Sequence, residues 1–112
     1  MDVHYSPELR QQSDLLRLLQ HASHLLGEIL GPQSSQVKAE WEQVQDHRGR
    51  PLYRLAIRDL TGEVSTEFDR DELKNSLHLR WRLYRLWGDL LQVRNNEQHQ
   101  QVQILSSQIT TG

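Results

Sequence analysis

The chain has 112 residues, a formal net charge of -2 at pH 7, and 36% hydrophobic and 25% charged residues. This length is typical of one domain with one core, and the small charge excludes a general attraction to phosphate backbones or anionic lipids. The absence of cysteine excludes disulfides and thiolate chemistry and favours a reducing compartment. No stretch has the roughly 20 apolar residues of a membrane span, so we predict a cytoplasmic protein without a membrane partner.

A first long helix is predicted over residues 7–30. Ser6 and Pro7 are typical of a helix start, because serine accepts hydrogen bonds from the first amides and proline has no amide to satisfy. Gly31 and Pro32 are typical of a helix end. Between these signals, leucines recur at spacings of three and four and predict a broad apolar face.

Three strands are predicted over residues 36–45, 52–60 and 63–68, because apolar and polar residues alternate in each. On the polar side, Arg54 and Arg58 of the middle strand lie between acidic residues of both neighbours. This acid, base, acid order places the middle strand in the centre of an antiparallel meander with one buried face. The acidic residues are Glu40, Glu42, Glu63 and Glu67.

A second long helix is predicted from about residue 70 to at least residue 94. Asp69 and Glu72 have the spacing of a capping box at its start. The apolar residues of this helix cover roughly 240° of its circumference, which is more than one sheet face can bury. The predicted fold is therefore α+β, in the order α-β-β-β-α, with two long helices over one face of the three-stranded meander.

The domain organisation is predicted as one domain at 1–96 and a glutamine-rich C-terminal tail at 97–112, which is either disordered or a helical extension. The tail retains a weak pattern, because six residues follow one another at spacings of four and three, as in a coiled coil. These residues are Leu91, Asn95, Gln98, Val102, Leu105 and Ile109.

The unburied apolar surface of the second helix predicts a homodimer. Gly88, which is unfavourable inside a helix, indicates either the close approach of another helix or a packing accommodation within the fold. Arg80 lies within the apolar arc and needs a carboxylate from Asp59, Asp14, Glu28 or a second subunit. The predicted interface consists of Arg80, Leu83, Leu86, Trp87, Gly88 and Leu90.

No catalytic motif accompanies this pattern. His21, His24 and Glu28 share one helix face, and this spacing suits zinc or iron ligands, but such residues are also typical of a solvated face. A HExxH motif and a glycine-rich phosphate loop are absent. We therefore predict no catalytic, metal or cofactor residues, and a non-enzymatic interaction or scaffold module that binds an unidentified protein.

Duplex RNA binding is the alternative function, through a basic stripe of Lys74, His78, Arg82 and Arg85. The predicted order of helix, three-strand meander and helix over residues 7–94 is similar to that of double-stranded RNA-binding domains. In that family a lysine-rich run at the start of the second helix meets phosphates across a groove. Here the corresponding stretch, residues 69–74, is mainly acidic, so the resemblance transfers no residue role and a nucleic-acid partner is not favoured.

Overall fold

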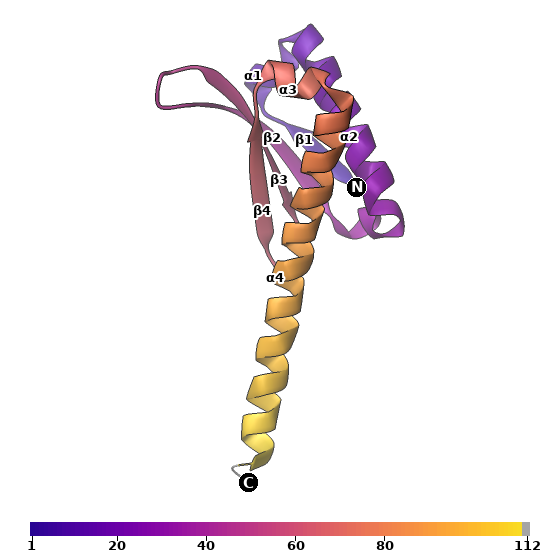
Figure 1. Ribbon diagram of the computed structural model, residues 1–112, viewed down its shortest axis with the longest axis vertical. Helices are drawn as coiled ribbons and strands as arrows, with labels where there is room; N and C mark the ends of the chain where they lie inside the picture. The colour runs from indigo at the N-terminus through magenta and orange to yellow at the C-terminus, as the bar shows by residue number, and fades with distance from the viewer. Residues whose placement is uncertain (111–112) are drawn as a thin grey trace.

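The computed structural model describes the backbone of residues 1–110 and the side chains of residues 1–96 (Figure 1). It contains four strands and two long helices, together with three short helical segments. In chain order, the elements are β1 (Asp2–Tyr5), α1 (Pro7–Arg10), α2 (Ser13–Leu30), the 3-10 helix η1 (Gly31–Gln36), β2 (Lys38–Gln45), β3 (Pro51–Arg58), β4 (Glu63–Phe68), α3 (Arg70–Lys74) and α4 (Ser76–Thr110).

The sheet confirms the predicted α+β class and the antiparallel meander, and it adds a strand. Its order is β1-β2-β3-β4, with β2, β3 and β4 antiparallel. The prediction of three strands is wrong, because β1 pairs with β2 in parallel, with Val3 opposite Ala39. Asp2–Tyr5 alternates polar and apolar residues, but four residues are the lower limit for this signal, and the parallel pairing depends on contacts distant in sequence. The sheet is therefore mixed, and both β2 and β3 lie inside it.

Each predicted long helix is interrupted near its start. The first ends after α1, where Gln12 leaves the helical conformation with φ -108° and ψ 85°, and it resumes as α2. Gly31, with φ 56°, ends α2 as predicted. The second begins with the predicted capping box of Asp69 and Glu72, but α3 stops after five residues. Asn75 starts α4 anew, because its side-chain oxygen accepts from the His78 amide at 3.2 Å.

The core lies between one face of the sheet and the two long helices α2 and α4 (Figure 1). Leucines of both helices are buried against strand residues such as Trp41 and Phe68, whose ring centroids are 6.0 Å apart. Helix α4 is longer than the sheet that it covers, so the molecule measures 61 × 33 × 25 Å. The predicted division into a domain at 1–96 and a tail at 97–112 involves side chains outside the described residues and stays a prediction.

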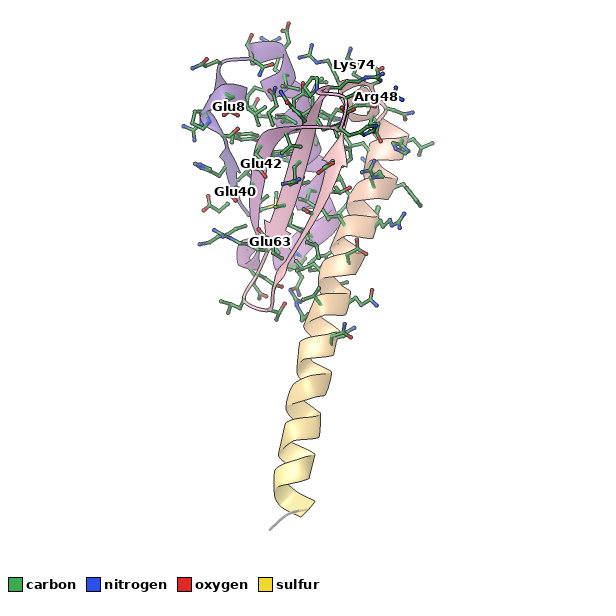
Figure 2. The ribbon with its side chains drawn as sticks, turned by 90° about the vertical axis from the view of Figure 1, so that its left-hand side faces the viewer. Glu8, Glu40, Glu42, Arg48, Glu63 and Lys74 are labelled. Carbon is green, nitrogen blue, oxygen red and sulfur yellow. The ribbon has the colours of Figure 1, made fainter. Side chains whose placement is uncertain are left out.

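Within residues 1–110, no helix covers the opposite face of the sheet, which carries charged side chains, among them Glu40, Glu42 and Glu63 (Figure 2). Arg54 pairs there with Glu42 at 3.1 Å and with Glu67 at 2.8 Å, as the alternating charges predict. Among the described residues, no helix combines the length and the hydropathy that a membrane span requires. The uncovered sheet face is therefore polar, and the unburied apolar side chains lie elsewhere.

Candidate functional site

Three large apolar side chains on α4 stay exposed to solvent. They are Leu77, Trp81 and Tyr84, with exposed fractions of 82%, 58% and 57%. Their spacings of four and three residues place them on one side of the helix, which we call the outer stripe. Leu79 and Leu83, which are fully buried, belong to the side that faces the sheet and α2. Helix α4 therefore has two apolar sides, of which the chain itself covers one.

The predicted interface mixes these two sides. Leu83, Leu86 and Leu90 are at most 1% exposed within the chain's own core, so they are not available to a second copy. The helical pattern shows two adjacent apolar sides and does not distinguish which one meets the sheet. The outer stripe is thus the part of the apolar arc that the interface prediction missed, although its residues were visible in the same pattern.

The other predicted interface residues lie at or near the surface. Arg80 is exposed and its guanidinium approaches the Glu28 carboxylate at 3.8 Å, so the structure selects Glu28 from the predicted partners. Gly88 is exposed, and a Cβ atom added there would meet nothing within 4 Å. Trp87 is half-buried against the core, with the guanidinium carbon of Arg94 5.4 Å from its ring centre.

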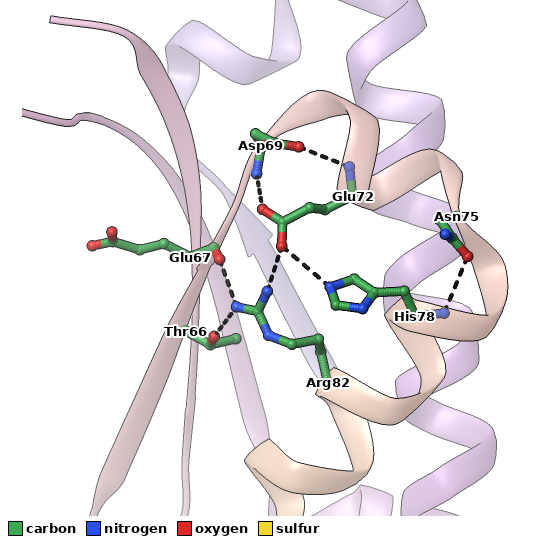
Figure 3. A network of polar contacts seen from close by, with 7 residues as sticks. All are labelled: Thr66, Glu67, Asp69, Glu72, Asn75, His78 and Arg82. Carbon is green, nitrogen blue, oxygen red and sulfur yellow. Dashed lines mark hydrogen bonds and ion pairs between the residues drawn. The ribbon is translucent and has the colours of Figure 1, made fainter. Parts of the chain in front are cut away.

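Arg82, the centre of the predicted basic stripe, is a structural residue (Figure 3). Its guanidinium donates to the Glu72 carboxylate at 2.7 Å, to the Glu67 carbonyl at 2.7 Å and to the Thr66 hydroxyl. It also lies 4.5 Å from the ring centre of Phe68. The side chain is only 19% exposed. Arg82 therefore joins α4 to α3 and to the outer edge of β4. There it hydrogen-bonds the Glu67 carbonyl, which a strand added at this edge would need as an acceptor.

The remaining residues of the predicted basic stripe do not form a continuous patch. His78 approaches the same Glu72 carboxylate at 3.3 Å and stacks on Trp81. The guanidinium carbon of Arg85 lies 5.7 Å from the ring centre of Trp81. Lys74 is exposed at the end of α3. Basic groups therefore border the outer stripe, and Glu72 offsets the charge of two of them, Arg82 and His78.

A second tie, which the sequence pattern does not predict, fixes α4 to the β3–β4 hairpin. Arg94 pairs with Asp59 at 2.6 Å, and the Asp59 side chain is 5% exposed. Burial raises the pKa of Asp59, but hydrogen bonds from Thr61 and Arg94 outweigh it and hold the pKa below its ordinary value. Asp59 was a candidate partner for Arg80; Arg94, 35 residues distant, binds it instead.

The described residues offer little for catalysis or metal binding. They contain no cluster of three metal-ligating side chains, and His24 pairs only with Glu28, at 3.2 Å on the surface of α2. The Ser6 hydroxyl is buried without a partner beside an open depression of about 240 Å³ that His4 also borders. No hydrogen bond in the described part of the chain links Ser6 to His4, although an activated serine needs such a base.

No family model, curated protein or solved structure matches the chain. Among the described side chains, four large hydrophobic residues stay exposed, and three of them form the outer stripe. The fourth, Leu60, lies alone in the turn after β3. Single exposed leucines are common on protein surfaces, whereas adjacent exposed aromatic and aliphatic residues mark contact surfaces.

Proposed function

We propose that the protein is a non-enzymatic interaction or scaffold module that acts as a homodimer, with the outer stripe of α4 as its contact surface. The observation that supports this proposal is the exposure of Leu77, Trp81 and Tyr84 on one side of a helix that extends past the sheet. Tryptophan and tyrosine are enriched at protein contacts, and full burial of such side chains contributes roughly 1.5–3 kcal/mol each.

The proposal includes the cytoplasm as the site of action, since a chain without cysteine suits a reducing compartment. Dimer formation leaves the charged face of the sheet and the β2–β3 hairpin free, and a further protein binds at one of these surfaces.

Sedimentation across micromolar concentrations tests the homodimer. We expect a reversible dimer whose dissociation constant rises at least about tenfold when Trp81→Ser and Tyr84→Ser are combined, because buried aromatic anchors dominate contact energies. Both side chains are more than half exposed, so the fold tolerates their replacement. Leu60→Ser is the control: it removes a fully exposed hydrophobic group away from α4 and leaves the dissociation constant unchanged.

Two outcomes contradict the homodimer. The first is a monomer at every concentration. The second is an unchanged dissociation constant in the Trp81→Ser and Tyr84→Ser variant, which places the contact on another surface.

Duplex RNA binding is not proposed, because Arg82 and His78 are already bound to Glu72. Lys74 and Arg85 alone supply too few phosphate contacts for strong binding, since affinity grows with each neutralised phosphate. Retention of the protein on duplex RNA at low salt, abolished by Lys74→Glu with Arg85→Glu, is the result that would restore this alternative.

A further inference from the structure

Resting on the proposed homodimer, we infer that the two copies of α4 pair in antiparallel orientation, so that the two sheets lie at opposite ends of the dimer. The outer stripe of one copy then meets the C-terminal part of α4 of the other copy. The partner for this surface is thus a second copy of the chain in one defined direction.

The outer stripe is the first part of a longer repeat. Its positions 77, 81 and 84 are followed by 88, 91 and 95, and then by 98, 102, 105 and 109, always at spacings of four and three. This alternation is the heptad repeat of helices that pair along a seam. One continuous helix, Ser76–Thr110, carries all ten positions. The repeat therefore runs without a break from the outer stripe, near the start of α4, to the weak coiled-coil pattern of the C-terminal tail.

The repeat is complementary to itself when one copy is reversed. Its midpoint is residue 93, so reversal places position 77 level with 109, 81 with 105, and 84 with 102. Leucine, tryptophan and tyrosine of one copy then stand level with isoleucine, leucine and valine of the other. The polar and small residues, Gly88, Asn95 and Gln98, all fall in the central part. Large apolar residues thus occupy both ends of the seam.

Charge favours the reversed orientation. Arg80 and Arg85 are exposed and border the outer stripe on its two sides; Glu28, 3.8 Å from the Arg80 guanidinium, offsets part of the Arg80 charge. In a parallel pair, Arg80 of each copy lies beside Arg85 of the other, which places like charges together on both sides of the seam. In an antiparallel pair, these arginines lie beside residues 98–109, which include no lysine, arginine, aspartate or glutamate. Arg94, near the centre, is already paired with Asp59.

The shape of the molecule allows this pairing. The sheet and α2 lie on the side of α4 that carries Leu79 and Leu83, away from the outer stripe, and α4 continues beyond the sheet (Figure 1). Alone, the stretch from Leu77 to Leu91 spans only about 21 Å, which is short for a stable helix pair. The reversed tail of a second copy supplies the remaining contact length, and both outer stripes are covered.

Thiol pairing tests the orientation, since the chain has no cysteine of its own. Full-length Tyr84→Cys and Val102→Cys variants are oxidised separately and also as a mixture after subunit exchange. An antiparallel pair centred at residue 93 brings position 84 next to position 102 of the other copy. It separates the two copies of position 84 by about 27 Å, whereas a disulfide needs Cα atoms within about 7 Å.

The expected result is a covalent dimer in the mixture, at least about tenfold more abundant than in Tyr84→Cys alone, because neighbouring thiols within a dimer reach millimolar effective concentrations. Asp89→Cys, at an exposed position of α4 outside the repeat, is the control and gives no covalent dimer in either orientation. Sedimentation of each unoxidised variant confirms that it still associates.

The failures of the two proposals are distinguishable. A covalent dimer from Tyr84→Cys alone overturns the antiparallel orientation and indicates a parallel pair. A chain that sediments as a dimer without a covalent product in the mixture also overturns it, because another register or surface then makes the contact. A chain that sediments only as a monomer overturns the homodimer itself, and an acidic helix of another protein becomes the occupant that the basic borders of the outer stripe fit.

Discussion

Ser23 shows how one hydroxyl group organises the core of this protein. Ser23 is buried, at 6% exposed. Its oxygen accepts from the Trp41 indole at 2.9 Å and from the Tyr5 hydroxyl at 3.2 Å, and it donates to the Leu19 carbonyl at 2.8 Å. These bonds satisfy the indole and connect α2 to β1 and β2. Ser23 thus fixes the strand that sequence patterning misses.

Ser23→Ala is expected to lower the free energy of unfolding by about 1–3 kcal/mol, because the buried Trp41 indole loses its acceptor. Urea unfolding followed by tryptophan fluorescence measures this loss. Ser35→Ala is the control, since that hydroxyl is exposed and its hydrogen bond to Pro32 is long, at 3.5 Å. A loss in Ser23→Ala no larger than in the control contradicts the role assigned to Ser23.

Asp59 links stability to pH. A carboxyl group with a lowered pKa in the folded state stabilises the fold above its unfolded pKa of about 3.9, and this contribution disappears as the pH falls through the lower folded pKa. We expect Asp59→Asn to lose about 1–3 kcal/mol at pH 7 and to lose less further stability in acid than the parent chain does.

Urea unfolding at a series of pH values measures this difference. Asp71→Asn, which changes an exposed carboxylate in the first turn of α3, is the matched control and retains the acid dependence of the parent. If Asp59→Asn and the parent lose the same stability between pH values of about 5 and 2, Asp59 is not the group responsible.

At the scale of elements, two contacts besides the Arg94–Asp59 pair hold the long helix α4 against the edge of the sheet. Arg82 joins its first half to β4 and to α3, through a carboxylate, a hydroxyl and a carbonyl (Figure 3). Further along, Val93 packs against the β3–β4 hairpin at Gly62, where a Cβ atom would lie 2.7 Å from the Val93 Cγ1 atom. The hairpin therefore needs glycine because the helix approaches so closely.

Gly62→Ala is expected to lower the free energy of unfolding by about 1–3 kcal/mol, because the valine side chain is stiff in a helix and cannot move aside. Adding Val93→Ala should restore most of this loss, and the double variant thus separates the clash from any effect on the turn. Gly27→Ala is the control, since its nearest neighbour would be the Met1 Cε atom at an ordinary 4.0 Å.

Denaturation curves of Gly62→Ala, of Gly27→Ala and of the double variant Gly62→Ala with Val93→Ala provide the measurement. We expect Gly27→Ala to be neutral or slightly stabilising, because alanine is favoured over glycine inside a helix. A Gly62→Ala protein as stable as the parent would show that the helix and the hairpin adjust without cost.

At the scale of the molecule, α4 extends past a folded head, which consists of the sheet, α2 and the first part of α4. Among the side chains that the structure describes, Leu90 is the last buried core residue of α4, and Arg94 is the last with a polar contact to the head. In the proposed dimer, the residues from 97 onward contribute to association. The predicted boundary between a domain at 1–96 and a tail at 97–112 stays a prediction.

A chain that ends after Asn96 is expected to keep the folded head and to lose the dimer. Near-ultraviolet circular dichroism, which reports the packing of Trp41 and Phe68, should be unchanged, while sedimentation should show a monomer at micromolar concentration. An unfolded product would mean that the tail belongs to the domain. A persistent dimer would place the contact within the head.

Much of the fold was predictable because its signals are local. The alternation that predicts strands over residues 36–45 and 52–60, the glycine at 31 and the capping box at 69–72 each act within a few residues. The structure has strands at Lys38–Gln45 and Pro51–Arg58, and it has this helix end and this cap. The break at Asn75 was missed, although asparagine before a leucine-rich helix is itself a start signal.

The sequence by itself determined that the second helix carries more apolar surface than one sheet face buries, because hydrophobic periodicity depends only on helix geometry. Only the tertiary structure decided which side is buried, since Leu83 and Tyr84 are equally apolar in the pattern and differ by their contacts with α2 and the sheet. The tertiary structure alone also decided the pairing of β1 with β2 and the partners of Arg82 and Asp59. Each depends on a pairing between distant residues, which local propensity does not encode.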